Sequence, residues 1–141
     1  MATISKENTQ IDYHKTIGEL SSILSKHGAT QISIDYQDGL PIGLDFAIKI
    51  EGQIFLFQLP CNWPGVLDKL KLSTLPKSKQ TRDQAIRVGW RIIKDWVVAQ
   101  LALIDSGAAS TLQAFLPCVK LNDGQTFFEK VSSGKINNLL N

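Results

Sequence analysis

The fold is decided by the stretch LPIGLDFAIKIEGQIFLFQL, residues 40–59. In its first half, apolar residues occupy the even positions of 42–50, and polar or small residues occupy the odd positions. This period of two predicts a strand with one face in a core and the other in water. Glu51-Gly52 predicts a turn, and residues 54–59 predict a second strand that is apolar on both faces. The second face of that strand needs cover from another element or another subunit.

Two elements precede this hairpin. Residues 32–36 alternate between apolar and polar side chains and predict a strand that ends at an Asp-Gly turn. Before it, apolar residues at helical spacing predict a helix that begins at Tyr13 and ends before Gly28. Residues 1–12 carry few apolar side chains and predict a flexible tail.

After the hairpin the sequence predicts mainly helices. Residues 62–72 fit a short helix, and residues 73–79 fit a linker. Thr81 with Gln84 fits a capping box, and the following sequence up to Gly107 fits one helix of about 36 Å. The remaining predicted elements are a helix at 110–116, a brief strand at 119–121 and a helix that starts at Thr126.

These elements define an α+β fold with an N-terminal helix, a three-stranded antiparallel meander, a long central helix and short C-terminal elements. A chain of 141 residues has room for one domain, which we place at residues 13–141. No run approaches the roughly 20 apolar residues that cross a bilayer, and residues 1–10 carry no secretory signal, so we expect a cytoplasmic protein. Cys61 and Cys118 are predicted to be buried thiols.

The charge of the chain is concentrated in one segment. Between Lys69 and Lys94 lie eight basic residues and one acid, a net charge of +7, although the formal charge of the whole chain is only +2. Such a cluster is typical of a surface that meets phosphates. The residues that we predict to bind nucleic acid are Lys77, Lys79, Arg82, Arg87, Arg91 and Lys94.

Three of these residues share one stripe of the long helix. Arg87, Arg91 and Lys94 are spaced i, i+4, i+7, which places their side chains on the same face. Two other interpretations use the same charges: a solvated face that maintains solubility, and a surface for an acidic protein. Trp63 and Trp90 have the chemistry to stack on unpaired bases, but the pattern favours core positions for both.

No catalytic machinery is predicted. The α-β-β-β-α order also occurs in metal-dependent nucleases, which place an acid on the second strand and a Glu-x-Lys on the third. Asp45 and Glu51 lie on the second strand, but residues 53–58 contain no acid and no lysine, so we reject this assignment and expect Asp45 on a solvated face. His14 and His27 are too far apart to share a metal, and a Cys-His nucleophile is the remaining catalytic alternative. We expect no catalytic residue, no metal site and no cofactor.

Several motifs are shared with a known family. They are TIGEL at 16–20, HGA at 27–29, WR at 90–91, VAQLALIDSG at 98–107, FLP at 115–117, NDGQT at 122–126 and SGKI at 133–136. Over about residues 13–140 the chain resembles a family of small uncharacterised proteins that recur in bacteriophages, prophages and other bacterial mobile elements. This resemblance implies either handling of DNA during replication or recombination, or the blocking of a host defence complex, and it implies no particular site residue.

The leading hypothesis is a non-catalytic nucleic-acid-binding accessory protein of a phage or mobile element, acting in DNA replication or recombination. It would bind single-stranded or duplex DNA through the basic helix, with little sequence preference. The doubly apolar third strand further predicts a homo-oligomer that repeats the basic stripe along DNA. The alternative is a protein-interaction module, such as an anti-defence (anti-CRISPR-like) inhibitor, that binds a host protein complex. No membrane partner is expected.

Overall fold

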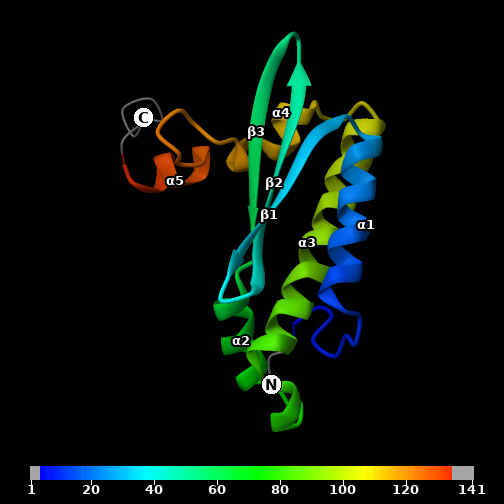
Figure 1. Ribbon diagram of the computed structural model, residues 1–141, viewed down its shortest axis with the longest axis vertical. Helices are drawn as coiled ribbons and strands as arrows, with labels where there is room; N and C mark the ends of the chain where they lie inside the picture. The colour runs from blue at the N-terminus through cyan, green and yellow to red at the C-terminus, as the bar shows by residue number, and fades with distance from the viewer. Residues whose placement is uncertain (1–3, 135–141) are drawn as a thin grey trace.

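A computed structural model describes residues 4–134 of the chain. Its elements confirm the predicted α+β fold (Figure 1). Residues 1–3 of the expected tail and 135–141 of the expected domain lie outside the described part. Within 4–134, no helix is both long and apolar enough to cross a membrane. The elements are α1 (Tyr13–Lys26), β1 (Ala29–Gln37), β2 (Leu40–Ile50), β3 (Gln53–Pro60), α2 (Trp63–Lys71), η1 (Lys77–Lys79), α3 (Arg82–Asp105), α4 (Thr111–Phe115), η2 (Leu116–Cys118) and α5 (Phe127–Ser132).

The three strands form one antiparallel sheet in the order β1-β2-β3. At its centre, Ala47 of β2 pairs with Gln31 of β1 and with Leu56 of β3. Both connections are two-residue turns, at Asp38-Gly39 and Glu51-Gly52, and all four of these residues have positive φ. This is type I′ geometry, which matches the right-handed twist of the strands that it joins.

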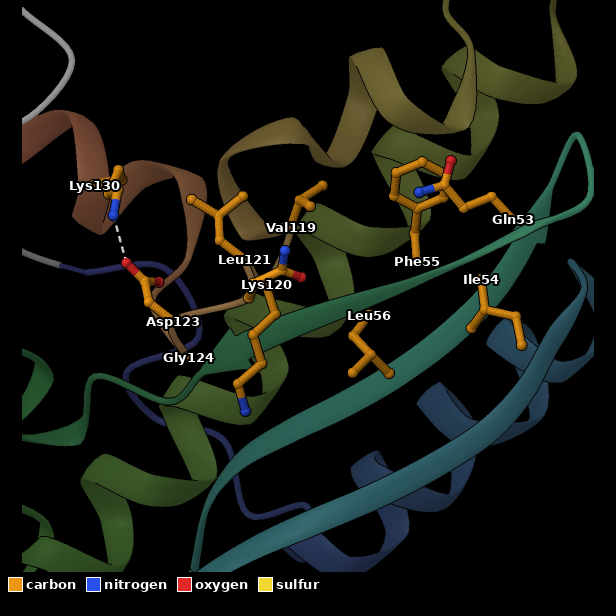
Figure 2. Close-up of a pocket in the computed structure, with 11 residues that line it drawn as sticks. Gln53, Ile54, Phe55, Leu56, Val119, Lys120, Leu121, Asp123, Gly124 and Lys130 are labelled. Atoms are coloured by element: carbon orange, nitrogen blue, oxygen red, sulfur yellow. Dashed lines mark hydrogen bonds and ion pairs between the residues drawn. The ribbon is translucent and has the colours of Figure 1, made fainter.

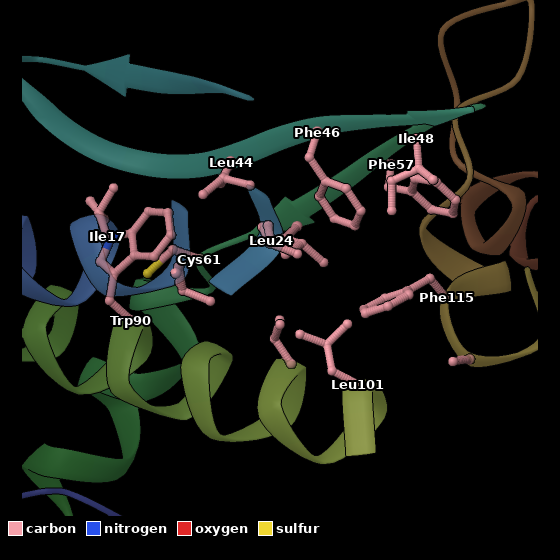
Figure 3. Close-up of a cluster of buried hydrophobic side chains, with 14 of the residues drawn as sticks. Ile17, Leu24, Leu44, Phe46, Ile48, Phe57, Cys61, Trp90, Leu101 and Phe115 are labelled. Carbon is pink, nitrogen blue, oxygen red and sulfur yellow. The ribbon is translucent and has the colours of Figure 1, made fainter. Parts of the chain in front are cut away.

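The helices α1 and α3 cover one face of the sheet, and the hydrophobic core lies between these layers (Figures 1 and 3). Phe46 and Phe57 stack with ring centroids 4.9 Å apart, and Phe115 meets both rings edge-on. Toward the other end of the core, Trp90 is fully buried, and its Nε1 donates a hydrogen bond to the carbonyl oxygen of Pro41 at 3.1 Å. The alternating positions of β2 thus face the core as their period predicted.

After α3, the chain returns to the outer edge of β3. The backbone N–H of Lys120 donates to the carbonyl of Leu56 at 2.8 Å, and Val119 forms a single antiparallel bridge with Phe57. The strand expected at 119–121 is therefore present only as isolated bridges. This segment covers part of the edge of β3, while the side chains of Ile54 and Leu56 remain exposed.

Residues 4–12, which we call the N-terminal strap, contact α3, whereas the sequence predicted a loose tail. The buried side chain of Gln84 donates through Nε2 to the carbonyl oxygens of Glu7 at 3.1 Å and Thr9 at 2.8 Å. A buried amide requires such partners, and the strap supplies them. The expected capping box is consequently half formed: Thr81 Oγ1 accepts from the backbone N–H of Gln84, but the Gln84 side chain turns to the strap.

Candidate nucleic-acid interface

The structure divides the basic cluster into two groups. Arg91 and Lys94 face α1, where both contact Glu19. The other six basic residues surround the connection between α2 and α3, and we call them the basic end: Lys69, Lys71, Lys77, Lys79, Arg82 and Arg87. Four of the six residues expected to bind nucleic acid therefore lie at the basic end, and two lie in an ion-pair network between helices.

Three elements meet at the basic end, which lies at the bottom of the view in Figure 1. The last turn of α2 carries two lysines, where positive charge offsets the negative end of the helix dipole. Pro76, whose φ is fixed, leads into the tight turn η1, and α3 begins at Arg82 behind its Thr81 cap. The first backbone N–H groups of α3 therefore also point toward this region. Within residues 4–134, no side chain of the basic end forms an ion pair.

Lys79 and Arg87 share a hollow of about 360 Å³ beside the N-terminal strap. Arg87 Nη1 donates to Gln84 Oε1 at 3.2 Å, and the Gln84 side chain is itself hydrogen-bonded to the strap. This contact positions the guanidinium and leaves its other N–H groups available to a ligand. Asp12, which also borders the hollow, caps α1 by accepting from the backbone N–H of His14. A guanidinium and an ammonium beside a hydroxyl can bind a phosphate group. The other residues that line the hollow are Gln10 and Ser78.

Glu19 of α1 holds the two remaining cations. Arg91 Nη1 donates to Glu19 Oε1 at 3.0 Å and to Thr16 Oγ1 at 3.2 Å, while Lys94 Nζ donates to Glu19 Oε2. The side chains of Arg91 and Lys94 are only 13% and 17% exposed. The hydrogen bond from Lys94, followed by that from Arg91, holds the pKa of Glu19 below its ordinary value against the effect of burial. These two cations join α1 to α3 and present little charge to solvent.

Replacing Glu19 by Gln should destabilise the protein at neutral pH, because Arg91 and Lys94 would keep their charges without the carboxylate. Since the pKa of Glu19 is lowered in the folded state, its stabilisation is fully present above the unfolded-state pKa and is lost as the pH falls through the folded-state pKa. Urea unfolding from about pH 7 to about pH 3 should show a difference between wild type and variant that shrinks toward acid. A difference that stays constant with pH would contradict this role.

The two tryptophans considered for base stacking lie mainly in the core. Trp90 is fully buried, and the half-buried Trp63 packs against both hydrophobic clusters. Trp63 also borders a small hollow of about 80 Å³ together with Arg82. Trp90 therefore offers no ring face for base stacking, whereas the half-buried Trp63 remains partly accessible beside Arg82.

A second candidate surface is the groove between β3 and residues 119–130, which we call the C-terminal segment (Figure 2). The groove is about 780 Å³ in volume. Ile54 is 65% exposed and Leu56 is 45% exposed. Both lysines of the groove are paired with carboxylates: Lys120 lies 3.7 Å from Asp45, and Lys130 contacts Asp123. The groove is thus apolar along β3 and neutralised at its rim, which suits a protein better than a phosphate. Its lining comprises residues 53–56, residues 119–124 and Lys130.

The environment of Asp45 differs from the solvated face that the sequence predicted. Its side chain is only 21% exposed and lies 3.7 Å from the ammonium group of Lys120. Burial, followed by the neighbouring charge of Asp35, raises the pKa of Asp45, and Lys120 opposes this shift. Asp45 Oδ1 is buried and has no hydrogen-bond partner within the described residues. Residues 4–134 contain no group of three or more His, Cys, Asp or Glu side chains that could hold a metal.

The Cys-His alternative lacks an activated thiol. Burial raises the pKa of Cys61 to about 12, and it also raises the pKa of Cys118, so both side chains are thiols at neutral pH. Both ring nitrogens of His27 are engaged, Nδ1 with the carbonyl of Ile23 at 2.9 Å and Nε2 with Asp105 Oδ2 at 3.1 Å. This histidine links the C-terminal ends of α1 and α3.

No protein-family model, curated protein or solved structure matches the chain significantly. The candidates for a functional site are therefore two surfaces of the chain itself, the basic end and the groove along β3.

Proposed function

We propose that the protein binds nucleic acid through the basic end. The observation that carries the proposal is the hollow in which Lys79 and Arg87 lie beside Ser78, with neither cation in an ion pair within residues 4–134. The four other cations of the basic end and the N-terminus of α3 add positive potential around it. A nucleic-acid backbone supplies the repeated anionic oxygens that suit such a surface.

The proposed contacts are to phosphates and not to base edges. Phosphate contacts fix position but carry little sequence information, so binding to single-stranded and duplex DNA is expected with weak sequence preference. Arg91 and Lys94 are assigned to the Glu19 network, and Lys69 and Lys71 take their place in the proposed surface. The setting, a non-catalytic role in DNA replication or recombination of a phage or mobile element, is supported by the family resemblance alone.

The salt dependence of DNA affinity tests this proposal. With about five phosphate contacts, log affinity should fall by about 4.5 per tenfold rise in salt for duplex DNA, which is a loss of several hundred-fold between about 50 and 200 mM. Fluorescence anisotropy of labelled single-stranded and duplex DNA measures this slope. Absence of binding at about 50 mM salt, or an affinity that does not change with salt, would contradict the proposal.

A second candidate function is a protein-interaction module, such as an anti-defence inhibitor that binds a host complex. The exposed side chains of Ile54 and Leu56 in the groove along β3 favour it. In that case purified protein should ignore DNA, and Leu56→Glu should prevent capture of the partner while charge reversal at the basic end leaves capture intact. DNA binding that is lost on charge reversal at the basic end, and is kept in Leu56→Glu, supports the basic end instead.

A further inference from the structure

The longest helix carries a second apolar stripe besides the one that faces the core. Its members follow one another at intervals of three or four residues, so they lie along one side of α3. We call this stripe the outer seam: Ala85, Val88, Ile92, Trp96, Ala99 and Leu103.

Only the first half of the outer seam is covered by α2. Ala85 and Val88 are buried against Val66 and Leu70 of α2 in the second hydrophobic cluster. However, α2 has 9 residues and α3 has 24, or about 14 Å against about 36 Å of helix. The seam therefore continues beyond the helix that covers it.

The second half of the outer seam is open within the described part of the chain. Trp96 is 39% exposed, Leu103 is 45% exposed, and Ala99 between them is also exposed. Phe115 meets the Trp96 ring edge-on with centroids 5.4 Å apart, and Leu116, the next residue, is 42% exposed. The outer seam thus meets α4 where Trp96 contacts Phe115.

We propose that this open half binds a second copy of the chain, with the two α3 helices packed antiparallel about a two-fold axis near Ala99. The pattern supports a self-interaction because it is self-complementary, with a small residue between two large ones. In an antiparallel pair, Trp96 lies opposite Leu103 of the partner subunit. The two Ala99 methyl groups meet at the axis, where small side chains let the helices approach closely.

The charges beside the outer seam favour the antiparallel direction. Lys6 of the N-terminal strap lies 3.7 Å from Asp95 and flanks the start of the open half. The last turn of α3 has no basic residue and ends at Asp105, which contacts His27. The carbonyls of residues 102–104 accept hydrogen bonds from residues 106–109, and the helix dipole still makes this end of α3 negative. An antiparallel pair brings Lys6 near this end of the partner helix, whereas a parallel pair would bring the two Lys6 side chains together.

The dimer would also fix the distance between two DNA-binding surfaces, a consequence that rests on the proposed function. The two basic ends would lie on opposite sides of the axis, roughly 50 Å apart along the paired helices at 1.5 Å per residue. Such a dimer would contact two separate phosphate stretches. Dimerisation itself is independent of DNA, so it is measured without DNA, and its failure leaves the proposed function standing.

Sedimentation equilibrium of the full chain, from about 1 to 200 μM, tests the dimer. The wild type should show a monomer–dimer equilibrium in the micromolar range, as expected for a small apolar interface. Leu103→Glu should weaken it at least tenfold. Two controls place the same charge on other exposed apolar positions, Val98 on the α1 side of α3 and Leu56 on β3, and neither should change the equilibrium. A monomeric wild type, or dissociation caused by Leu56→Glu and not by Leu103→Glu, would overturn the proposal.

Crosslinking gives a second readout that does not depend on destabilising the dimer. In a Cys118→Ser background, Ala99→Cys places two thiols near the two-fold axis, and a short bifunctional maleimide should link them into a covalent dimer. Val98→Cys, one residue away but on another side of the helix, should link poorly. Equal yields at the two positions would contradict an interface centred on Ala99.

Discussion

Reversing the charge of Lys79 and Arg87 together should lower DNA affinity by about 100-fold or more at about 50 mM salt, and should reduce the salt slope by about two. The two cations share one hollow, so the double variant Lys79→Glu/Arg87→Glu replaces two attractions to phosphate by two repulsions at the same place. Both side chains are half-buried, and neither forms an ion pair within residues 4–134. Fluorescence anisotropy at several salt concentrations measures both quantities.

A matched control separates a local effect from a change in net charge. Lys26 at the end of α1 and Lys49 near the β2–β3 turn are exposed and lie at the end of the molecule opposite to the basic end (Figure 1). Lys26→Glu/Lys49→Glu changes the formal charge by the same amount and should keep most of the affinity. Equal losses in the two double variants would mean that overall charge, and not the basic end, attracts DNA.

Replacing Trp90 by Ala should lower the free energy of unfolding by about 3–5 kcal/mol, the largest stability loss that we expect from a single substitution. The side chain is fully buried, and its Nε1 donates to the carbonyl of Pro41 at the start of β2. The variant therefore loses a large apolar contact and leaves a buried carbonyl without its donor. Urea unfolding followed by circular dichroism measures the change.

The milder variant Trp90→Phe distinguishes the core role from base stacking. It should cost about 1–2 kcal/mol, because most apolar contact remains while the hydrogen bond is lost. Its DNA affinity should equal that of the wild type under conditions in which the variant is folded. Normal stability combined with a loss of binding to single-stranded DNA would assign Trp90 to stacking instead.

Local signals in the sequence predicted most of the fold. The alternation over residues 42–50 places Leu44 and Phe46 on the core face of β2, and the Asp-Gly and Glu-Gly pairs form the two type I′ turns. Thr81 caps α3 as expected because its hydroxyl meets a backbone N–H only three residues ahead. Each of these features is set within a few residues of chain.

The candidate site was harder to predict because its composition depends on tertiary contacts. In the sequence, Arg91 and Lys94 carry the same charge as Arg87 and share its helix face. In the fold, both form ion pairs with Glu19, which lies more than 70 positions earlier. Likewise, Gln84 has the spacing of a capping-box residue, but its side-chain amide donates to backbone carbonyls of the strap instead. A count of charges does not separate paired cations from free ones, and the pairing here follows from how α1 lies on α3.

The open half of α3 was missed for a related reason. The spacing of Trp96, Ala99 and Leu103 is visible in the sequence, but an apolar stripe normally indicates a buried face. Its exposure depends on the length of α2, which ends at Lys71 and covers only the first half of the outer seam. Relative lengths of packed helices emerge only from the assembled fold.

The most direct test of the central claim is to map the DNA-contacting residues by NMR, following backbone amide shifts of labelled protein as a short duplex is added. If DNA binds at the basic end, the largest shifts should fall on η1 and the first two turns of α3, residues 77–88, and on the last turn of α2. Shifts centred on the groove at residues 53–56 and 119–124, or no shifts at about 50 mM salt, would contradict it.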